Sequence, residues 1–264
     1  MSIPEPRHIG AVNWLGLWTH YAKEVKRFYK VGFQTLVAPV ITTLLFLAIF
    51  TLALGGSLSE LGGVPFEQFL APGLIMMAII QNSFSNTTSS LMISKIQGNI
   101  VDMLMPPISP GEMTSGFVLA GATRGLLVAL SVGVAISLFV PLRIYDAGMI
   151  VFHGLSATLM LSLMGLITAV WADKFDQIAS ITNFVIMPLS FLSGTFYSIE
   201  RLPPMWQDIA LINPFFYIID GFRHGFIGHH DGSPVTGVVL ISVINACLWW
   251  TCHRMFSRGY KLKN

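Results

Sequence analysis

Long apolar segments constrain this chain more than any other feature of its sequence. A helix needs roughly 20 predominantly apolar residues to cross the hydrocarbon core of a bilayer. Charged residues make up only 11% of the chain, whereas a soluble domain has about 25%. Six segments meet the length requirement, at about residues 33–55, 69–92, 114–140, 148–171, 178–197 and 235–255. We therefore expect an all-α membrane protein with six transmembrane helices.

The second and fifth segments depart from a uniformly apolar pattern. The second contains a run of polar residues in which Asn82, Asn86 and Ser89 share one helical face. Such a stripe either forms hydrogen bonds with neighbouring helices or lines a hydrated path, and the sequence leaves both readings open. The fifth segment contains Pro188, which we expect to kink its helix because proline lacks a backbone N–H.

The distribution of lysine and arginine predicts the orientation. If both termini are cytoplasmic, the outer side holds only Arg143, Arg201 and Arg223. The inner side then holds Arg7, Lys23, Lys26, Arg27, Lys30, Lys95, Lys174, Arg254, Arg258, Lys261 and Lys263. Cytoplasmic loops carry the excess of basic residues. We expect a multi-pass protein with both ends inside, divided into an N-terminal helix (1–32), a membrane domain (33–256) and a basic tail (257–264).

Residues 10–30 carry the pattern of an amphipathic helix. Its apolar stripe consists of Trp14, Trp18, Tyr21, Val25 and Phe28. Basic residues gather near its C-terminal end. This combination is typical of a helix that lies along the cytoplasmic leaflet and contacts membrane lipids. The alternative is that the same helix packs against the protein's own spans.

The cytoplasmic loop between the second and third segments contains a short apolar helical face. That face consists of Ile96, Ile100, Met103 and Leu104. Three prolines, the first at Pro106, then end the helix. A short helix with an exposed apolar face can dock into a groove of a cytosolic partner. The alternative is a connector that only covers the ends of the spans.

The stretch from Glu200 to Gly225 is too polar to span a membrane and too apolar for an ordinary loop. Pro203 and Pro204 suit the first turn of a short helix. Asn213-Pro214 then breaks that helix, and a second helical piece follows. We expect a pair of short helices that enters the outer leaflet and returns. In the second helix, Asp220 and Arg223 are spaced to pair.

Arg124 is a cation inside the third apolar segment. It lies about one turn from the inner boundary, so its side chain can extend to the lipid headgroups. Alternatively it pairs with an acidic residue near the same face, namely Glu112, Asp173 or Asp176. Gly121 and Gly125 flank it with the spacing that allows two helices to approach closely.

The sequence lacks the motifs of an enzyme or of an autonomous pump. It contains no GxxxxGK[ST] phosphate-binding loop, no HExxH and no GxSxG. The spans hold no acidic pair of the kind that ion-coupled carriers use. The net charge of +2 gives no reason to expect a nucleic-acid partner. We interpret the cluster His224, His229, His230 and Asp231 as a solvated loop rather than a metal site.

Three stretches resemble the ABC-2 type transporter permeases, which are bacterial inner-membrane subunits that pair with a separate ATPase. The longest is Phe191–Gly225, and the second is Ala71–Asn82, "APGLIMMAIIQN". The third is the loop Lys95–Pro107, where the family is richer in glutamate. The residues that follow the family's order are Gly194, Pro203 or Pro204, Asn213, Pro214, Tyr217 and Arg223 in the first stretch, and Gly98, Asp102, Leu104 and Pro106 in the third.

The resemblance implies a permease that moves a lipid, drug-like or glycan substrate outward across the inner membrane. It implies a homodimer with two ATPase subunits, which bind the ATP and Mg²⁺, so this chain would be no enzyme and would hold no cofactor. The loop helix would be the coupling helix, and the pair after span five would be an outer gate. Two alternatives remain: a membrane scaffold or assembly protein without transport activity, and a secondary carrier.

The resemblance also assigns candidate residues to each of these parts. The ATPase-coupling residues would be Lys95, Ile96, Gly98, Ile100, Asp102, Met103 and Leu104. The outer-gate residues would be Gly194, Pro203, Pro204, Asn213, Pro214, Tyr217, Asp220 and Arg223. Candidate pathway residues are Asn82, Asn86, Ser89, Phe191, Phe196 and Tyr197. For the three aromatic residues, the alternative is an interfacial belt that never touches a substrate.

Overall fold

The structure is a computed structural model that describes residues 10–55, 60–61 and 63–261. Arg7 and Lys263, which contributed to the prediction of orientation, lie outside the described residues. The described chain is mostly helical, and its strands form one short antiparallel hairpin. The elements are α1 (Trp14–Tyr29), α2 (Gly32–Leu54), β1 (Glu60–Leu61), β2 (Val64–Pro65), α3 (Phe66–Ile96), α4 (Ile100–Leu104), α5 (Pro110–Ser137), α6 (Ala147–Trp171), α7 (Phe175–Ile181), η1 (Thr182–Ile186), α8 (Met187–Leu192), η2 (Ile199–Arg201), α9 (Pro204–Ile212), α10 (Pro214–Ile227) and α11 (Pro234–Ser257).

Five helical segments of the described chain are long and apolar enough to cross a membrane. They are Gly32–Ala53, Pro110–Ser137, Ala147–Trp171, Phe175–Leu192 and Pro234–Ser257. These five coincide with five of the six expected spans. The remaining one corresponds to α3, which at 31 residues exceeds the length of a span but carries the polar run. The sequence-based expectation of an all-α membrane protein is therefore confirmed, while the number six stays a prediction.

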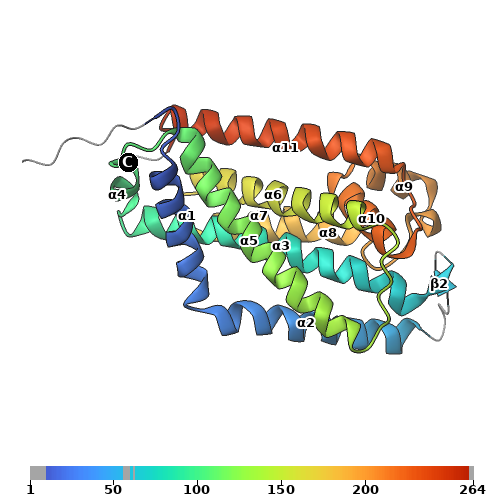
Figure 1. Ribbon diagram of the computed structural model, residues 1–264. Coiled ribbons are helices and arrows are strands. Elements are labelled where there is room, and N and C mark those ends of the chain that lie inside the picture. Colours follow the sequence, from blue (N-terminus) through green and yellow to red (C-terminus); the bar gives the residue numbers. More distant parts are fainter. Residues whose placement is uncertain (1–9, 56–59, 62, 262–264) are drawn as a thin grey trace, which may run out of the picture.

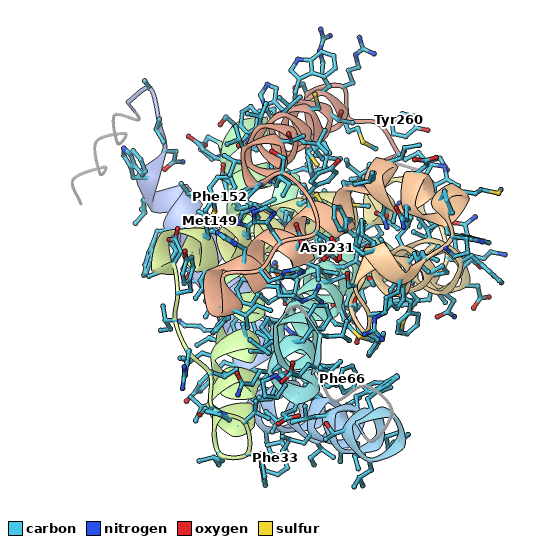
Figure 2. The ribbon with its side chains drawn as sticks, turned by 90° about the vertical axis from the view of Figure 1, so that its right-hand side faces the viewer. Phe33, Phe66, Met149, Phe152, Asp231 and Tyr260 are labelled. Carbon is cyan, nitrogen blue, oxygen red and sulfur yellow. The ribbon has the colours of Figure 1, made fainter. Side chains whose placement is uncertain are left out.

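The long helices run roughly side by side as a bundle (Figure 1). Helices α1 and α4 and the C-terminal end of the chain lie at one end of this bundle. Helices α9 and α10 and the β-hairpin lie at the opposite end (Figure 1). Figure 2 looks onto that second end, where Asp231 is labelled. The two ends of the bundle thus carry different elements, and which end is cytoplasmic stays a prediction.

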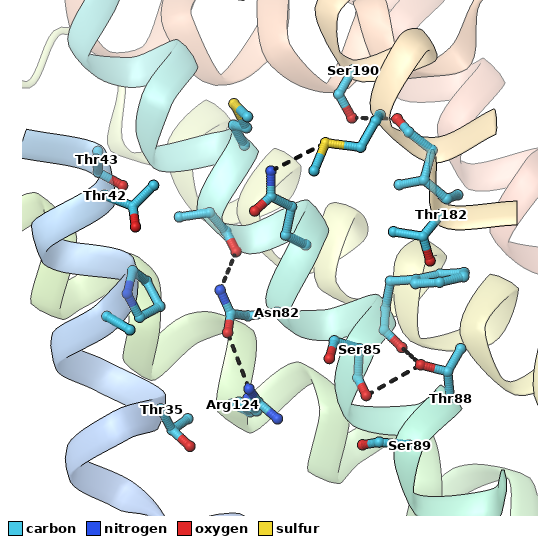
Figure 3. Close-up of a pocket in the computed structure, with 18 of the residues that line it drawn as sticks. Thr35, Thr42, Thr43, Asn82, Ser85, Thr88, Ser89, Arg124, Thr182 and Ser190 are labelled. Carbon is cyan, nitrogen blue, oxygen red and sulfur yellow. Dashed lines mark hydrogen bonds between the residues drawn. The ribbon is translucent and has the colours of Figure 1, made fainter. Parts of the chain in front are cut away.

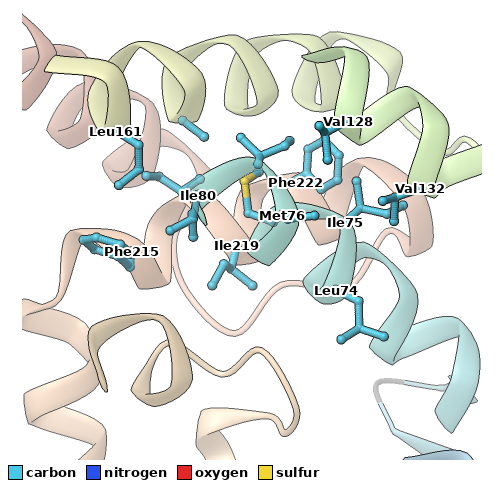
Figure 4. Packing of buried hydrophobic residues seen from close by; sticks show 14 of the residues in the cluster. Leu74, Ile75, Met76, Ile80, Val128, Val132, Leu161, Phe215, Ile219 and Phe222 are labelled. Atoms are coloured by element: carbon cyan, nitrogen blue, oxygen red, sulfur yellow. The ribbon is translucent and has the colours of Figure 1, made fainter. Parts of the chain in front are cut away.

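Helix α3 forms the centre of the bundle, in contact with α2, α5, α6 and α10. All of its residues from Phe69 to Ile80 are buried. Figure 4 shows how the apolar side chains of this half interdigitate with those of α5, α6 and α10. The labelled members are Leu74, Ile75, Met76, Ile80, Val128, Val132, Leu161, Phe215, Ile219 and Phe222. A central position explains why α3 tolerates polar residues, since its polar groups meet protein rather than lipid.

Small residues allow α3, α5 and α6 to approach closely, as the glycine pair in α5 predicted. A methyl group at Gly121 would collide with Ser162, and one at Gly125 would collide with Ser83. A methyl group at Gly165 on α6 would likewise collide with Thr87 on α3. Close backbone approach at small residues is a common means of helix packing in membranes.

The fifth span is interrupted as Pro188 predicted. A π-helical stretch, η1, separates α7 from α8, and Pro188 lies in the first turn of α8. The π-helical stretch contains Phe184, whose carbonyl the proline ring would otherwise approach. The three pieces remain continuous, since α7, η1 and α8 follow without a gap.

Candidate functional site

A polar groove of about 630 Å³ lies between α2, α3 and the α7–α8 segment. This volume falls within the range of small-molecule sites, roughly 300–1,000 Å³. Figure 3 shows that hydroxyl and amide side chains from all three elements face it. They include Thr35, Thr42 and Thr43 on α2, Gln81, Asn82, Ser85, Thr88 and Ser89 on α3, Thr182 on η1 and Ser190 on α8. Polar side chains thus share the lining of this groove with apolar ones such as Phe46, Leu74 and Met77.

The predicted polar stripe of α3 forms one wall of this groove. Asn82 and Ser89 line it, whereas Asn86 is only 1% exposed and lies behind the lining. Asn82 donates to the Ala78 carbonyl at 3.0 Å and accepts a hydrogen bond from another helix. The stripe therefore bonds neighbouring helices, as the first reading expects, and two of its members also face the groove, whereas a hydrated path along it stays a prediction.

Arg27 ties the N-terminal helix to this wall. Its Nη2 donates to the backbone carbonyl and the side-chain oxygen of Asn86, at 2.9 and 3.0 Å. Its Nε donates to Glu24 at 3.1 Å, and the buried Glu24 carboxylate also accepts from the Ser90 hydroxyl. Sequence reasoning placed Arg27 among the basic residues of α1 and missed this network. A glutamate among lysines on one helix is a weak signal, because the same pattern is common on solvated faces.

The apolar stripe of α1 lies partly inside the protein and partly on its surface. Phe28 is 4% exposed and packs into the protein together with His20, whose ring meets Phe117 edge-on at 4.4 Å. Trp14 and Trp18 are 72% and 64% exposed. One face of the helix therefore packs on the spans, as the alternative proposed, while contact of the exposed tryptophans with lipid stays a prediction.

Arg124 points into the groove rather than toward an acidic partner. Its Nη2 donates to Asn82 Oδ1 at 3.2 Å, and its Nε is buried without a hydrogen-bond partner in the described structure. The acidic residues considered as partners are used elsewhere. Glu112 caps α5 through Ser109, and Asp173 accepts from Lys261 at 2.9 Å. The alternative of an Arg124–carboxylate pair is therefore wrong, since the structure supplies an amide, and the first reading, extension to the lipid headgroups, stays a prediction.

The loop helix α4 turns its predicted apolar face inward. Ile100 and Met103 are 8% and 7% exposed and pack with Phe117 and Phe256. The exposed residues of this region include Ile96, Val101, Asp102 and Met105. The expectation that Ile100 and Met103 form an exposed docking face is thus wrong, because the protein's own core covers them. Leu104 is half-buried against the same cluster.

Two other residues assigned to this loop have structural roles. Lys95 Nζ donates to the carbonyls of Ala169, Val170 and Ala172, at 3.3, 3.0 and 2.6 Å. It therefore holds the C-terminal end of α6, where a cation suits the helix dipole. Gly98 adopts a φ of +73°, which lets the chain turn between α3 and α4.

The outer segments follow the predicted sequence of breaks. Pro204 and Pro214 occupy the first turns of α9 and α10, with Pro203 directly before α9. The Asn213 side chain accepts from the Phe215 N–H and donates to Leu189 at the end of α8. Asn213 therefore caps α10 and fixes the break against the fifth span.

Asp220 and Arg223 do not pair with each other as expected. Asp220 accepts from the backbone N–H groups of Asp231 and Gly232, at 2.8 and 3.0 Å. The buried Arg223 donates to the Gly194 carbonyl at 2.7 Å and stacks over the Phe69 ring. Each residue thus anchors a different loop to α10. Gly194 has a φ of +72°, which explains the glycine at this turn.

Asp231 joins these loops, although the sequence offered only a glycine-flanked acid as a signal. Its carboxylate accepts from Ser198, from the Ile199 N–H and from His229, each at 2.9 Å. The 229–232 loop is thus attached to η2 and is more than a solvated loop. Within the described ranges, no group of three or more His, Cys, Asp or Glu side chains has a metal-binding arrangement.

Two of the three predicted pathway aromatics, Phe191 and Phe196, belong to an aromatic cluster beside the groove. Phe196 stacks on Phe50 at 4.5 Å and lies near Phe46 and Phe191, at 6.3 and 5.6 Å. Phe46 also lines the groove. Tyr197 packs apart from this cluster, with Ile199 and neighbours of η2. Tyr217, assigned to the outer gate, packs edge-on against Phe216 at 5.1 Å.

Comparison with known proteins identifies the architecture. The ABC-2 type transporter family matches residues 16–227. Inner membrane transport permease YadH of Escherichia coli (strain K12) is 36% identical over 251 residues, which cover 95% of this chain and 98% of YadH. Nodulation protein J of Neorhizobium galegae is 24% identical, over 88% of this chain and 86% of that protein. This chain therefore belongs to the ABC-2 type transporter family of membrane permeases.

Proposed function

We propose that this chain is the membrane subunit of an ATP-driven exporter, in which two copies work with two copies of a separate ATPase. The single observation that carries the proposal is the polar groove beside α3. Polar and charged side chains within a membrane bundle are costly, and those of the groove, which include Arg27 and Arg124, mark a substrate or ion pathway. Transport would require the walls of the groove to move. In this proposal, α2 and the interrupted α7–α8 segment shift relative to α3.

A second copy would complete the groove. The two elements that flank it, α2 and α7–α8, expose large apolar side chains to their surroundings. These are Ile41, Leu45, Ile49 and Leu52 on α2 and Phe175, Phe184 and Val185 on the α7–η1 segment. If the same faces of two copies met, two grooves would combine into one enclosed path. The formation of such a contact by the same surface on both copies is the usual geometry of a twofold dimer.

The ATPase would dock at the α4 end of the bundle. Val101 and Met105 are 51% and 77% exposed, and Asp102 lies between them on the surface. Their neighbours Ile100 and Met103 pack into the core, so a displacement of α4 by the ATPase would also displace α3 and α5. The partner would hold the ATP and Mg²⁺, because this chain has no phosphate-binding loop.

The membrane placement follows from the same arrangement. Helix α3 would be the sixth span, both termini would be cytoplasmic, and α1 would lie at the inner surface. The α9–α10 pair would enter from the outer side and act as a gate. An inner-membrane location is supported by the name of the YadH relative. For the substrate, we retain a lipid, drug-like or glycan molecule, since the groove has both hydroxyl and apolar lining residues.

The proposal is tested by purifying the tagged full-length chain from its native membrane in a mild detergent. We expect a P-loop ATPase to co-purify, and we expect its ATP hydrolysis to change at least severalfold when the chain is removed. A scaffold protein would purify without nucleotide-dependent activity. A secondary carrier would transport unchanged when ATP hydrolysis of the partner is blocked. Either result would overturn the exporter proposal.

A further inference from the structure

Two guanidinium groups reach the groove from different helices. Arg27 comes from α1 and Arg124 from α5, and both line the groove. Each is positioned by an asparagine of α3, Arg27 by Asn86 and Arg124 by Asn82. These asparagines are four residues apart, so they follow one another along one helical face at about 5–6 Å. The two cations are therefore placed at successive levels of the same wall.

The positive charge at this wall is only partly balanced. Glu24 pairs with Arg27, which leaves Arg124 without a carboxylate. Among the described residues that line the groove, Arg27 and Arg124 are the charged ones. The buried Nε of Arg124 has no acceptor in the described structure. A partly buried cation without a counterion is energetically costly, and an anion that binds there reduces that cost.

The remaining lining suits a molecule with both an anionic and an apolar part. The Ser89 hydroxyl accepts from Arg27 at 3.4 Å and donates to the Asn86 carbonyl, while the Ser85 hydroxyl in the same lining can donate a further hydrogen bond. Apolar side chains are interspersed with these polar groups in the lining. They include Phe46, Leu74, Met77, Ile186 and Met187. The groove thus offers both two cations and apolar surface to one bound molecule.

We propose that the groove binds an anionic amphiphile, with its phosphate or carboxylate between Arg27 and Arg124 and its apolar part against α2 and α8. Planar guanidinium groups match the geometry of both anions. The inference rests on the proposed function only in regarding this groove as the substrate's path. The binding itself needs no ATPase and is therefore measurable on the permease alone.

The test measures binding of octyl phosphate to the full-length chain in phosphatidylcholine nanodiscs, by isothermal titration calorimetry with empty nanodiscs subtracted. Octyl glucoside has the same chain and a neutral head, and inorganic phosphate has the anion without the chain. We expect octyl phosphate to bind at least tenfold more tightly than either. Equal binding of octyl glucoside would overturn the role of the arginines. Equal binding of inorganic phosphate would reduce the site to one for a free anion and overturn the amphiphile.

Variants locate the site. We expect Arg124→Gln to weaken octyl phosphate binding about 10- to 100-fold, the usual effect of removing a charged hydrogen bond. Arg124→Lys should retain part of the binding. Arg201→Gln, an exposed arginine of η2, is the matched control and should bind like the wild type. Unchanged binding in a folded Arg124→Gln chain would overturn the proposal. If that variant does not fold, the comparison of the three probes on the wild type still decides.

The two proposals can fail separately. Co-purification with an active ATPase, together with no preference for octyl phosphate, would leave the exporter function standing and remove only the anionic substrate class. If octyl phosphate binds selectively but no ATPase co-purifies, the anionic substrate class stands and the exporter function is overturned.

Discussion

Arg27 and Asn86 connect α1 to α3 through two hydrogen bonds from one guanidinium nitrogen, at 2.9 and 3.0 Å. Because Asn86 lies directly behind the groove lining, the N-terminal helix is attached to the wall of the groove. A movement of α1 at the membrane surface would therefore reach α3 without passing through a loop. The following predictions concern this attachment, the packing of α3 and the contact with the ATPase.

Removal of the Glu24 carboxylate should loosen α1. Glu24 is 1% exposed and holds both Arg27 and the Ser90 hydroxyl. Glu24→Ala should weaken the docking of α1 by about 1–3 kcal/mol, since the buried Ser90 hydroxyl and the partly buried Arg27 lose their acceptor. Hydrogen exchange of the α1 amides measures this effect. Lys26→Ala, an exposed position on the same helix, is the control. Equal protection in both variants would show that Glu24 does not hold the helix.

Acidification should also weaken the docking of α1, through His20. Burial lowers the pKa of His20 below its ordinary value of 6.5, and nearby Lys23 lowers it further against an opposing effect of Glu24. The undocked helix therefore takes up a proton near pH 6.5, whereas the docked helix does so only at lower pH. The stability of docking is complete above pH 6.5 and falls as the pH drops toward the lowered pKa.

The same hydrogen-exchange measurement tests this pH dependence. The α1 amides, corrected for intrinsic exchange, should lose protection between pH 7.5 and 5.5. His20→Phe removes the titrating group, and its ring can pack against Phe117 as the imidazole does. The variant should therefore lose the pH dependence. A variant that kept the wild-type response would exclude His20 as its source.

Gly125 should be the position of α5 least able to accept a side chain. A methyl group there would meet Ser83 and Thr158, on α3 and α6 respectively. Gly125→Ala should reduce stability by about 1–3 kcal/mol, the usual cost of overpacking a tight core. Gly133→Ala on the same helix is the control, because its methyl group would meet only Ile75 at an ordinary 3.8 Å. Thermal unfolding of the detergent-purified chain compares the two, and equal melting temperatures would contradict the tight contact.

The two faces of α4 should respond differently to a charge. Val101→Asp places a carboxylate on the exposed face, so the chain should fold normally but lose at least tenfold in ATPase affinity. Ile100→Asp buries a charge in the core and should destabilise the fold itself. Thermal stability and ATPase co-purification separate these effects. Normal association of Val101→Asp would show that the partner docks elsewhere.

Composition and periodicity predicted most of the fold. A sufficiently long apolar segment predicts a span whatever helices it packs against, so the long helices were predictable. The interruption of the fifth span near Pro188 was also predictable. The proline-marked starts of α9 and α10 were also predictable, because proline acts through local geometry. The inward face of α4 was not predictable, since a short apolar stripe looks the same whether a partner or the protein's own core covers it.

The candidate site was predictable only in part. The stripe of Asn82 and Ser89 appears in the sequence because helical spacing alone places these residues on one face. The contact of Arg27 with Asn86 joins residues far apart in the chain and depends on where α1 packs. Likewise, nothing in the spacing of Asp220 and Arg223 shows that each has better partners in another loop.

The central claim is that the groove beside α3 is a path opened by the partner's ATP hydrolysis. Its most direct test is the accessibility of one cysteine, Thr42→Cys in the groove wall, in a chain with Cys247→Ser and Cys252→Ser. The measurement is labelling by a membrane-impermeant thiol reagent added to the outer side of vesicles containing the complex. We predict that labelling accelerates severalfold during ATP turnover and stays slow with a hydrolysis-deficient ATPase. Labelling at the same rate in both would contradict the account.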